Sequence, residues 1–100
     1  MKRLPKQEVK PGLIYFTQQE YARLLAVAAD ANELEATWEE WLQSREKAKL
    51  KLALAGISVV DVPVEVDELL KYCLQENIPL DSGARAAYVA EKLRQTGIGG

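Results

Sequence analysis

The sequence contains no histidine, so the side chain most often used as a general base, a metal ligand or a pH switch near neutrality is missing. It has one cysteine, Cys73, and therefore cannot form a disulfide within the chain. Cys73 falls in an apolar helical stripe, where a thiol acts as a small hydrophobic group rather than a nucleophile. The sequence also lacks a phosphate-binding loop, a nucleophile elbow and a dinucleotide fingerprint. An enzyme is thus the least favoured class, and we expect no catalytic residues and no cofactor.

Neither sign of charge dominates, because thirteen basic side chains stand against fifteen acidic ones and the formal net charge is −2. Such a balance commits the chain as a whole neither to nucleic acid nor to a membrane surface. No apolar run is long enough to cross a bilayer, and no signal peptide opens the sequence. We therefore predict a soluble cytoplasmic protein that does not bind a membrane.

Composition divides the chain into three parts. Residues 1–11 are proline-containing and basic, which predicts a flexible arm. Residues 12–96 hold most of the 48% of hydrophobic residues and predict a single globular domain with one modest core. Residues 97–100 form a glycine-rich tail that is expected to be flexible.

The longest helical pattern lies between Asn32 and Gly56. Asn32 and Glu35 have the spacing of a capping box, and Gly56 stands where a helix favours a left-handed residue after its last turn. Residues 49–54 also alternate with period two, as a half-buried strand would, but their Lys, Leu and Ala side chains favour a helix. One face of the predicted helix is apolar and holds Leu34, Trp38, Trp41, Leu42, Ala48 and Leu52.

The remaining pattern predicts two short strands and three further helices. Thr17 and Glu20 repeat the capping-box spacing, Pro63 marks the end of a β-branched strand or an edge position in the sheet, and Asp81 or Ser82 caps the last helix. The strands are expected over 13–16 and 57–62, and the helices over 17–30, 66–77 and 81–97. Their buried faces are expected to hold Tyr21, Leu24, Leu25 and Ala28; Val66, Leu69, Leu70, Cys73 and Leu74; and Ala86, Val89, Ala90 and Leu93. The predicted fold class is α+β, predominantly helical, with four helices and a two-stranded sheet.

Arg45 and Lys49 project into the apolar face of the long helix. Such cations extend past the apolar face to water, pack over a tryptophan ring, or are directed at an anionic ligand or partner. A second charged group is the acidic cluster of Asp61, Glu65, Asp67 and Glu68. Its spacing matches no calcium loop, so we predict no metal site and interpret the cluster as a solvated edge or a surface for a basic partner.

Two functions follow from the surface residues. The first is a small non-catalytic protein-interaction or regulatory module, since aromatic and arginine side chains are favoured as interface anchors. Its candidate partner-binding residues are Arg45, Lys49, Tyr72, Arg85 and Tyr88. The alternative is a nucleic-acid-binding accessory protein that uses the basic arm and the segment 45–51. Its candidate residues are Lys2, Arg3, Lys6, Lys10, Lys47 and Lys51. No oligomeric state is predicted.

The chain ends in Gly99-Gly100, which resembles the ends of ubiquitin-like modifiers and small sulfur-carrier proteins. The resemblance implies a C-terminal carboxylate that becomes activated. It covers two residues, and those proteins have a β-rich grasp fold, whereas this chain is predicted to be mainly helical. We therefore do not assign the chain to either group.

Overall fold

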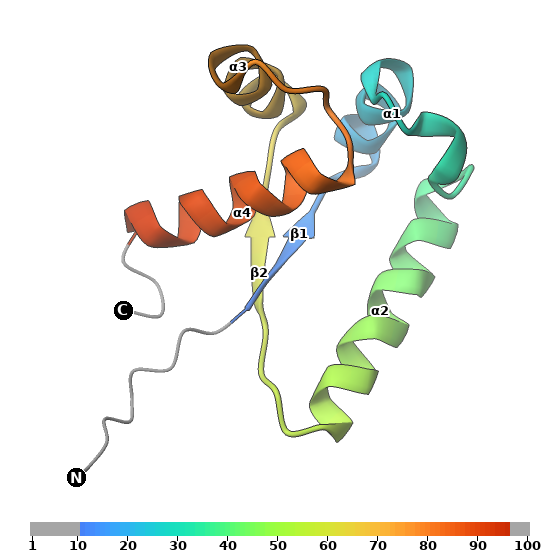
Figure 1. Ribbon diagram of the computed structural model, residues 1–100. Coiled ribbons are helices and arrows are strands. Elements are labelled where there is room, and N and C mark those ends of the chain that lie inside the picture. Colours follow the sequence, from blue (N-terminus) through green and yellow to red (C-terminus); the bar gives the residue numbers. More distant parts are fainter. Residues whose placement is uncertain (1–10, 97–100) are drawn as a thin grey trace, which may run out of the picture.

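The computed structural model describes residues 11–96, so most of the predicted basic arm and the whole glycine-rich tail lie outside the described residues. Within this part of the chain, four α-helices and one 3₁₀ turn surround two short strands (Figure 1). The elements are β1 (Gly12–Tyr15), α1 (Gln18–Val27), η1 (Ala31–Glu33), α2 (Trp38–Leu54), β2 (Val60–Pro63), α3 (Val66–Glu76) and α4 (Ser82–Thr96). The predicted α+β fold with four helices and a two-stranded sheet is confirmed.

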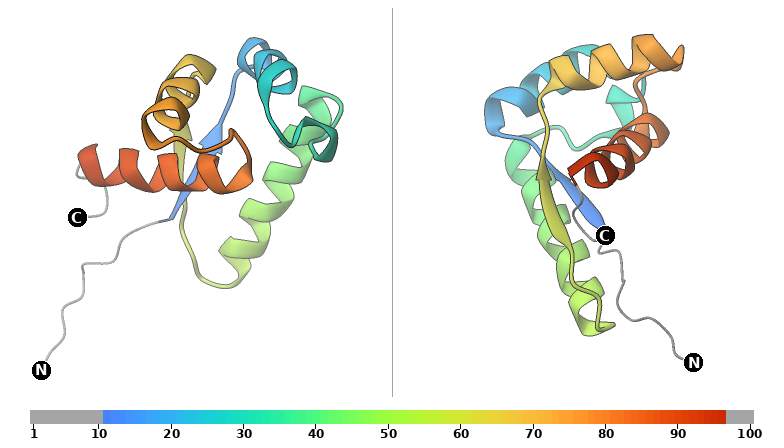
Figure 2. Two further views of the ribbon diagram at one scale, coloured as in Figure 1. Left: turned by 45° about the horizontal axis from the view of Figure 1, so that its top comes forward. Right: turned by 90° about the vertical axis from the view of Figure 1, so that its left-hand side faces the viewer.

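The two strands pair in parallel, with Gly12 opposite Val60 and Ile14 opposite Val62. A parallel pair needs a crossover connection, which here consists of α1, η1 and α2. Helix α4 crosses one face of the strand pair and α2 runs along the other side (Figure 2, right). Alternate residues of each strand therefore point toward different helices.

Gly12 lies where α4 comes closest to β1. A Cβ atom at this position would lie 2.6 Å from Leu93 and 2.7 Å from Val89, both on α4. Any larger residue at this position would require the side chains of Leu93 and Val89 to shift.

Three helices begin at side-chain caps. The hydroxyl of Thr17 accepts a hydrogen bond from the backbone N–H of Glu20, and a carboxylate oxygen of Asp81 accepts one from the N–H of Ala84, as predicted. The predicted start of the long helix at Asn32 is wrong. Its cap is Thr37, which accepts a hydrogen bond from the N–H of Glu40, because the sequence offers a second capping pattern five residues later.

The end of α2 agrees with the prediction. Gly56 has a φ of 82°, its N–H donates to the carbonyl of Ala53, and the N–H of Ile57 donates to that of Leu52. This pair of bonds satisfies the last carbonyls of the helix. Residues 49–54 are therefore helical. The first helix ends at Val27, three residues before the predicted limit.

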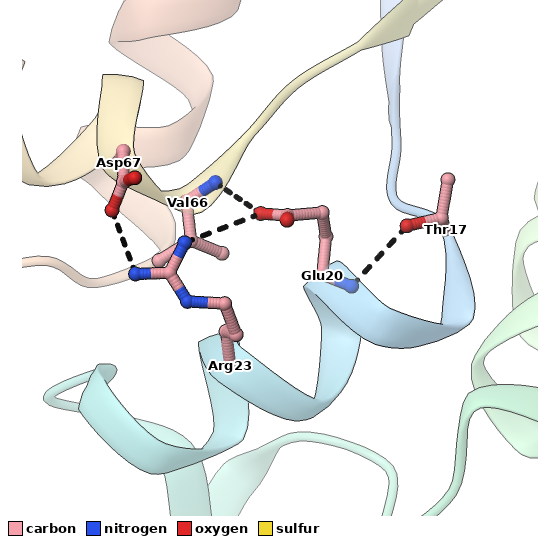
Figure 3. Close-up of polar contacts among 5 residues, drawn as sticks. All are labelled: Thr17, Glu20, Arg23, Val66 and Asp67. Carbon is pink, nitrogen blue, oxygen red and sulfur yellow. Dashed lines mark hydrogen bonds and ion pairs between the residues drawn. The ribbon is translucent and has the colours of Figure 1, made fainter.

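The start of α3 is satisfied by a side chain from α1 instead of a local cap. The carboxylate of Glu20 accepts a hydrogen bond from the N–H of Val66 at 2.7 Å, as Figure 3 shows. Glu20 also lies 3.9 Å from Arg23, which donates to Asp67 at 2.6 Å. These contacts bind α1 to the first turn of α3 and use the favourable placement of acids at a helix N-terminus.

The core lies among the strands, α1, α3 and α4. It consists of Phe16, Tyr21, Leu24, Val62, Val64, Val66, Leu69, Cys73, Leu80, Ala84, Val89 and Leu93. Four residues predicted to be buried are exposed instead: Leu70, Leu74, Ala86 and Ala90. The apolar stripes were predicted too wide, since periodicity shows which residues share a face but not how much of that face a neighbour covers.

Candidate functional site

Arg45 is buried and directed at β1. Its guanidinium donates to the carbonyls of Ile14 at 2.7 Å and Leu13 at 2.9 Å. It also lies 5.8 Å from the ring centre of Trp41 and 5.2 Å from that of Tyr15. The interpretation of this cation as packing over a tryptophan ring is confirmed.

The alternation of a parallel ladder explains why the Ile14 carbonyl needs a partner. Val60 and Val64 of the β2 segment donate to the carbonyls of Pro11 and Tyr15, so the carbonyl of Ile14 points away from β2. The carbonyl of Phe16, two residues later, also points away from β2 and accepts a hydrogen bond from the indole N–H of Trp38 at 2.9 Å. Side chains of α2 thus satisfy the outer edge of β1.

Asp61 completes the contacts of Arg45. Its carboxylate lies 2.7 Å from Arg45 and 3.5 Å from the ammonium of Lys49. The hydrogen bond from Arg45 lowers the pKa of the Asp61 carboxyl against the opposing effect of burial. Arg45 and Lys49 therefore both have an anionic neighbour within the fold, and the alternative in which they are directed at an anionic ligand or partner stays a prediction.

Arg85 forms a second ion pair, with Asp30. The two guanidinium nitrogens donate to the two carboxylate oxygens at 3.0 Å and 2.8 Å, and the side chains are 11% and 14% exposed. The hydrogen bond from Arg85 lowers the pKa of Asp30, although burial acts in the opposite direction. This pair joins α4 to the turn that follows α1.

Tyr72 and Tyr88 meet edge to face, with ring centres 5.3 Å apart. The hydroxyl of Tyr88 donates to Glu68 at 2.8 Å, and Lys92 lies 3.2 Å from the same carboxylate. Burial and the Glu68 carboxylate raise the pKa of Tyr88 to about 12. Burial opposes ionisation of Glu68, but the hydrogen bonds from Tyr88 and Lys92 leave its pKa below the ordinary value.

The predicted partner-binding residues thus occupy three separate groups. Arg45 and Lys49 share Asp61, Tyr72 packs on Tyr88, and Arg85 is paired with Asp30. Each has a contact within the fold, and a role in partner binding stays a prediction. Of the residues predicted to bind nucleic acid, Lys47 and Lys51 are exposed on α2, whereas Lys2, Arg3, Lys6 and Lys10 lie outside the described residues.

The remaining groups with reactive side chains are the acidic cluster and Cys73. Asp61, Asp67 and Glu68 of the acidic cluster each face a cation. Within residues 11–96, no group of three or more Cys, Asp or Glu side chains is placed to hold a metal ion. Cys73 is buried, and burial raises the pKa of its thiol.

A surface that the sequence did not suggest lies at the end of α3. We define the α3 patch as Val27, Leu70, Leu74 and Ile78, which come from α1, α3 and the segment after α3. They are 36–83% exposed, with Leu74 at 83%. The four side chains line one hollow together with the buried Cys73 and Leu80.

A second exposed apolar group lies at the end of α2. We define the α2 patch as Leu50, Leu54 and Ile57, which are 60%, 80% and 40% exposed. Leu50 and Ile57 border an open hollow between the helix and the returning segment 56–59. One signal for this patch was present in the sequence. When a period-two alternation is folded as a helix, Leu52 turns toward the protein while Leu50 and Leu54 turn away from it.

No protein-family model, curated protein or solved structure matches the chain. No helix among residues 11–96 combines the length and the apolar character that crossing a membrane requires. The functional proposal therefore depends on the contacts and exposed surfaces of the chain itself.

Proposed function

We propose that the chain is a non-catalytic interaction module that binds a partner protein through the α3 patch. The observation that carries this proposal is the gathering of four exposed apolar side chains from three segments around one hollow. Single exposed apolar side chains are common, but a contiguous group with a polar rim is typical of a binding surface.

The shape of the α3 patch supports the binding of a protein side chain. Its floor contains Cys73 and Leu80, each 6% exposed, and its rim contains the highly exposed Leu74. An aliphatic or aromatic side chain laid on this shallow hollow would lose water on the side that covers the apolar floor, as interface residues do.

The charges around the α3 patch favour a protein over a polyanion. The exposed neighbours on the last turns of α3 include one cation and one anion, Lys71 and Glu76, together with the uncharged Gln75 and Asn77. A surface for nucleic acid would present an excess of cations, because phosphate contacts dominate such binding.

The non-catalytic part of the proposal is supported by the chemistry of the titratable groups. The carboxyls of Asp30 and Asp61 have pKa values lowered by hydrogen bonds from arginines, that of Glu68 has one lowered by hydrogen bonds from Tyr88 and Lys92, and burial raises the pKa of the Cys73 thiol. A general base or nucleophile active near neutrality needs the opposite shifts.

Quantitative affinity capture from the native cell extract tests the proposal. The tagged wild-type chain is compared with Leu74→Asp, which places a charge in the α3 patch, and with Leu54→Asp, an equally exposed leucine in the α2 patch. We expect one captured protein to decrease at least about tenfold with Leu74→Asp, which is roughly 1.4 kcal/mol of binding free energy, and to be retained with Leu54→Asp.

Nuclease treatment provides the second arm of this experiment. The captured protein is expected to remain after nuclease digestion. Loss of all captured material after digestion would instead support the nucleic-acid alternative. Equal capture by the wild type and Leu74→Asp would exclude the α3 patch as the binding surface.

A further inference from the structure

We propose that the C-terminal end of α2 docks on the surface of an anionic lipid bilayer. This inference concerns the α2 patch and is independent of the α3 patch. It departs from the expectation that the protein does not bind a membrane, because that expectation used charge averaged over the whole chain.

Charge is distributed unevenly along the sequence. The segment 47–60 contains three lysines and is bounded by the exposed acids Glu46 and Asp61, so it carries a local excess of positive charge although the chain as a whole has a net charge of −2. Lys47 and Lys51 are exposed, while Lys49 is in contact with Asp61. Juxtaposed lysines of this kind attract a surface of anionic headgroups.

The exposed lysines and leucines lie next to one another on the helix. Leu50 and Leu54 are one turn apart, and so are Lys47 and Lys51, so each pair forms a short row along α2. The two rows are adjacent on the side of the helix that faces away from Arg45 and β1, since Arg45 defines the opposite side. An apolar row beside a cationic row is the pattern of helices that lie in the bilayer interface.

The position of the α2 patch makes it accessible to a flat surface. The end of α2 and the segment that returns to β2 form one extremity of the described chain, far from α1 and α3 (Figures 1 and 2). Leu54 lies in the last turn of the helix and is 80% exposed.

This geometry favours a bilayer over a protein partner. A leucine at a protruding end can enter a soft interface without a matching cavity, whereas a protein would need to provide one. Leu54 is such a leucine, because it lies outside the lining of the hollow that Leu50 and Ile57 border. The contact at α2 would be peripheral, because none of the helices in residues 11–96 meets the requirements of a membrane span.

Vesicle co-sedimentation of the full chain tests the inference. The probes are vesicles of phosphatidylserine and phosphatidylcholine, vesicles of phosphatidylcholine alone, and soluble polyglutamate as an acidic polypeptide. We expect binding to the mixed vesicles only, and we expect it to weaken about tenfold when the ionic strength rises from roughly 0.05 M to roughly 0.5 M.

Matched variants separate the α2 patch from other exposed residues. Leu54→Ser is expected to weaken vesicle binding about fivefold to tenfold, whereas Leu74→Ser, at a leucine of similar exposure on α3, is expected to leave it unchanged. Lys51→Glu is expected to weaken binding about tenfold, in contrast to Lys71→Glu on the exposed side of α3. Circular dichroism confirms that each variant is folded.

Three outcomes would overturn the inference. Equal binding to charged and uncharged vesicles would exclude recognition of anionic lipid. Binding to polyglutamate without binding to vesicles would assign the lysines to an acidic protein partner. Equal loss of vesicle binding in Leu54→Ser and Leu74→Ser would show that the α2 patch is not the docking surface.

Discussion

At the scale of single residues, Arg45 connects the longest helix to the sheet. It is the charged residue that the described part of the chain buries most fully, at 7% exposure. Its guanidinium satisfies the carbonyls of Leu13 and Ile14 and neutralises Asp61. A buried cation of this kind is costly to leave unpaired, but its removal also leaves its acceptors without donors.

We predict that Arg45→Met lowers the free energy of unfolding by about 3 kcal/mol, because the partly buried carbonyl of Ile14 loses its hydrogen bond. Arg45→Lys is expected to rescue only part of this loss, since one ammonium cannot reproduce the planar fork of donors. Urea unfolding followed by tryptophan fluorescence measures the change. Lys47→Met, an exposed position on the same helix, serves as the control and is expected to change stability by less than about 0.5 kcal/mol. Equal stability of Arg45→Met and the wild type would contradict the role assigned to Arg45.

Asp30 gives stability a defined dependence on pH. Its pKa in the folded protein is lowered by Arg85, so the pair contributes fully above the ordinary carboxyl pKa of about 4, and the contribution is lost as the pH falls through the folded value. We predict that Asp30→Asn costs about 2–3 kcal/mol at neutral pH, because Arg85 loses its partner in a mostly buried site.

The same variant is expected to show a weaker dependence of stability on pH below about 5 than the wild type. Urea unfolding midpoints at a series of pH values measure both effects. Parallel curves for the two proteins would mean that Asp30 does not titrate as the ion pair requires.

At the scale of the elements, the crossing of α4 over β1 depends on a single glycine. We predict that Gly12→Ala destabilises the fold by about 1–3 kcal/mol, since the new methyl group would overlap Leu93 and Val89. Gly83→Ala is the matched control. Gly83 lies in the first turn of α4, and its nearest contact would be an ordinary 3.5 Å to Asp81, so the substitution is expected to be neutral or stabilising by up to about 1 kcal/mol. Thermal melting of both variants gives the comparison, and a neutral Gly12→Ala would show that α4 packs less closely than described.

Local sequence signals predicted most of the elements and their ends. The residues that mark boundaries act locally, through a side-chain hydrogen bond to a nearby N–H, through a positive φ, or through a missing N–H. They are Thr17, Gly56, Pro63, Asn77 and Asp81. The start of the longest helix was misplaced because Asn32 and Thr37 both head a capping pattern, and choosing between them depends on tertiary contacts. The partner of Arg45 could not be predicted either, since Ile14 and Asp61 are brought to it only by the parallel pairing.

The exposed patches were missed for a related reason. Leu70 and Leu74 continue the apolar stripe of α3. The sequence pattern does not show that, on this helix, neighbouring elements bury only Val66, Leu69 and Cys73. Helical periodicity gives the direction of a side chain, whereas coverage depends on the position of other elements. Candidate interface residues chosen for being aromatic or cationic proved to have contacts inside the fold.

At the scale of the whole molecule, two apolar surfaces of different character lie on separate elements. The α3 patch combines residues of three segments around a shallow hollow, and the α2 patch lies at the end of one helix beside the exposed Lys47, Lys51 and Glu46. Truncation of a large core side chain lowers the free energy of unfolding by about 2–5 kcal/mol. Because Leu54 and Leu74 are about 80% exposed, neither side chain contributes much to the core.

We predict that Leu74→Ser and Leu54→Ser each change the free energy of unfolding by less than about 0.5 kcal/mol. Chemical denaturation of the two variants measures this directly. A loss of more than about 2 kcal/mol in either variant would show that the side chain belongs to the core and not to a binding surface.

Photo-crosslinking in the native cell tests the central claim most directly. A benzophenone amino acid replaces Leu74 in one protein and Gln43, an exposed polar residue of α2, in another. The account predicts a covalent adduct with one partner protein from position 74 and none from position 43. An adduct from position 43 alone, or no adduct from position 74, would contradict the proposal that the α3 patch binds a partner protein.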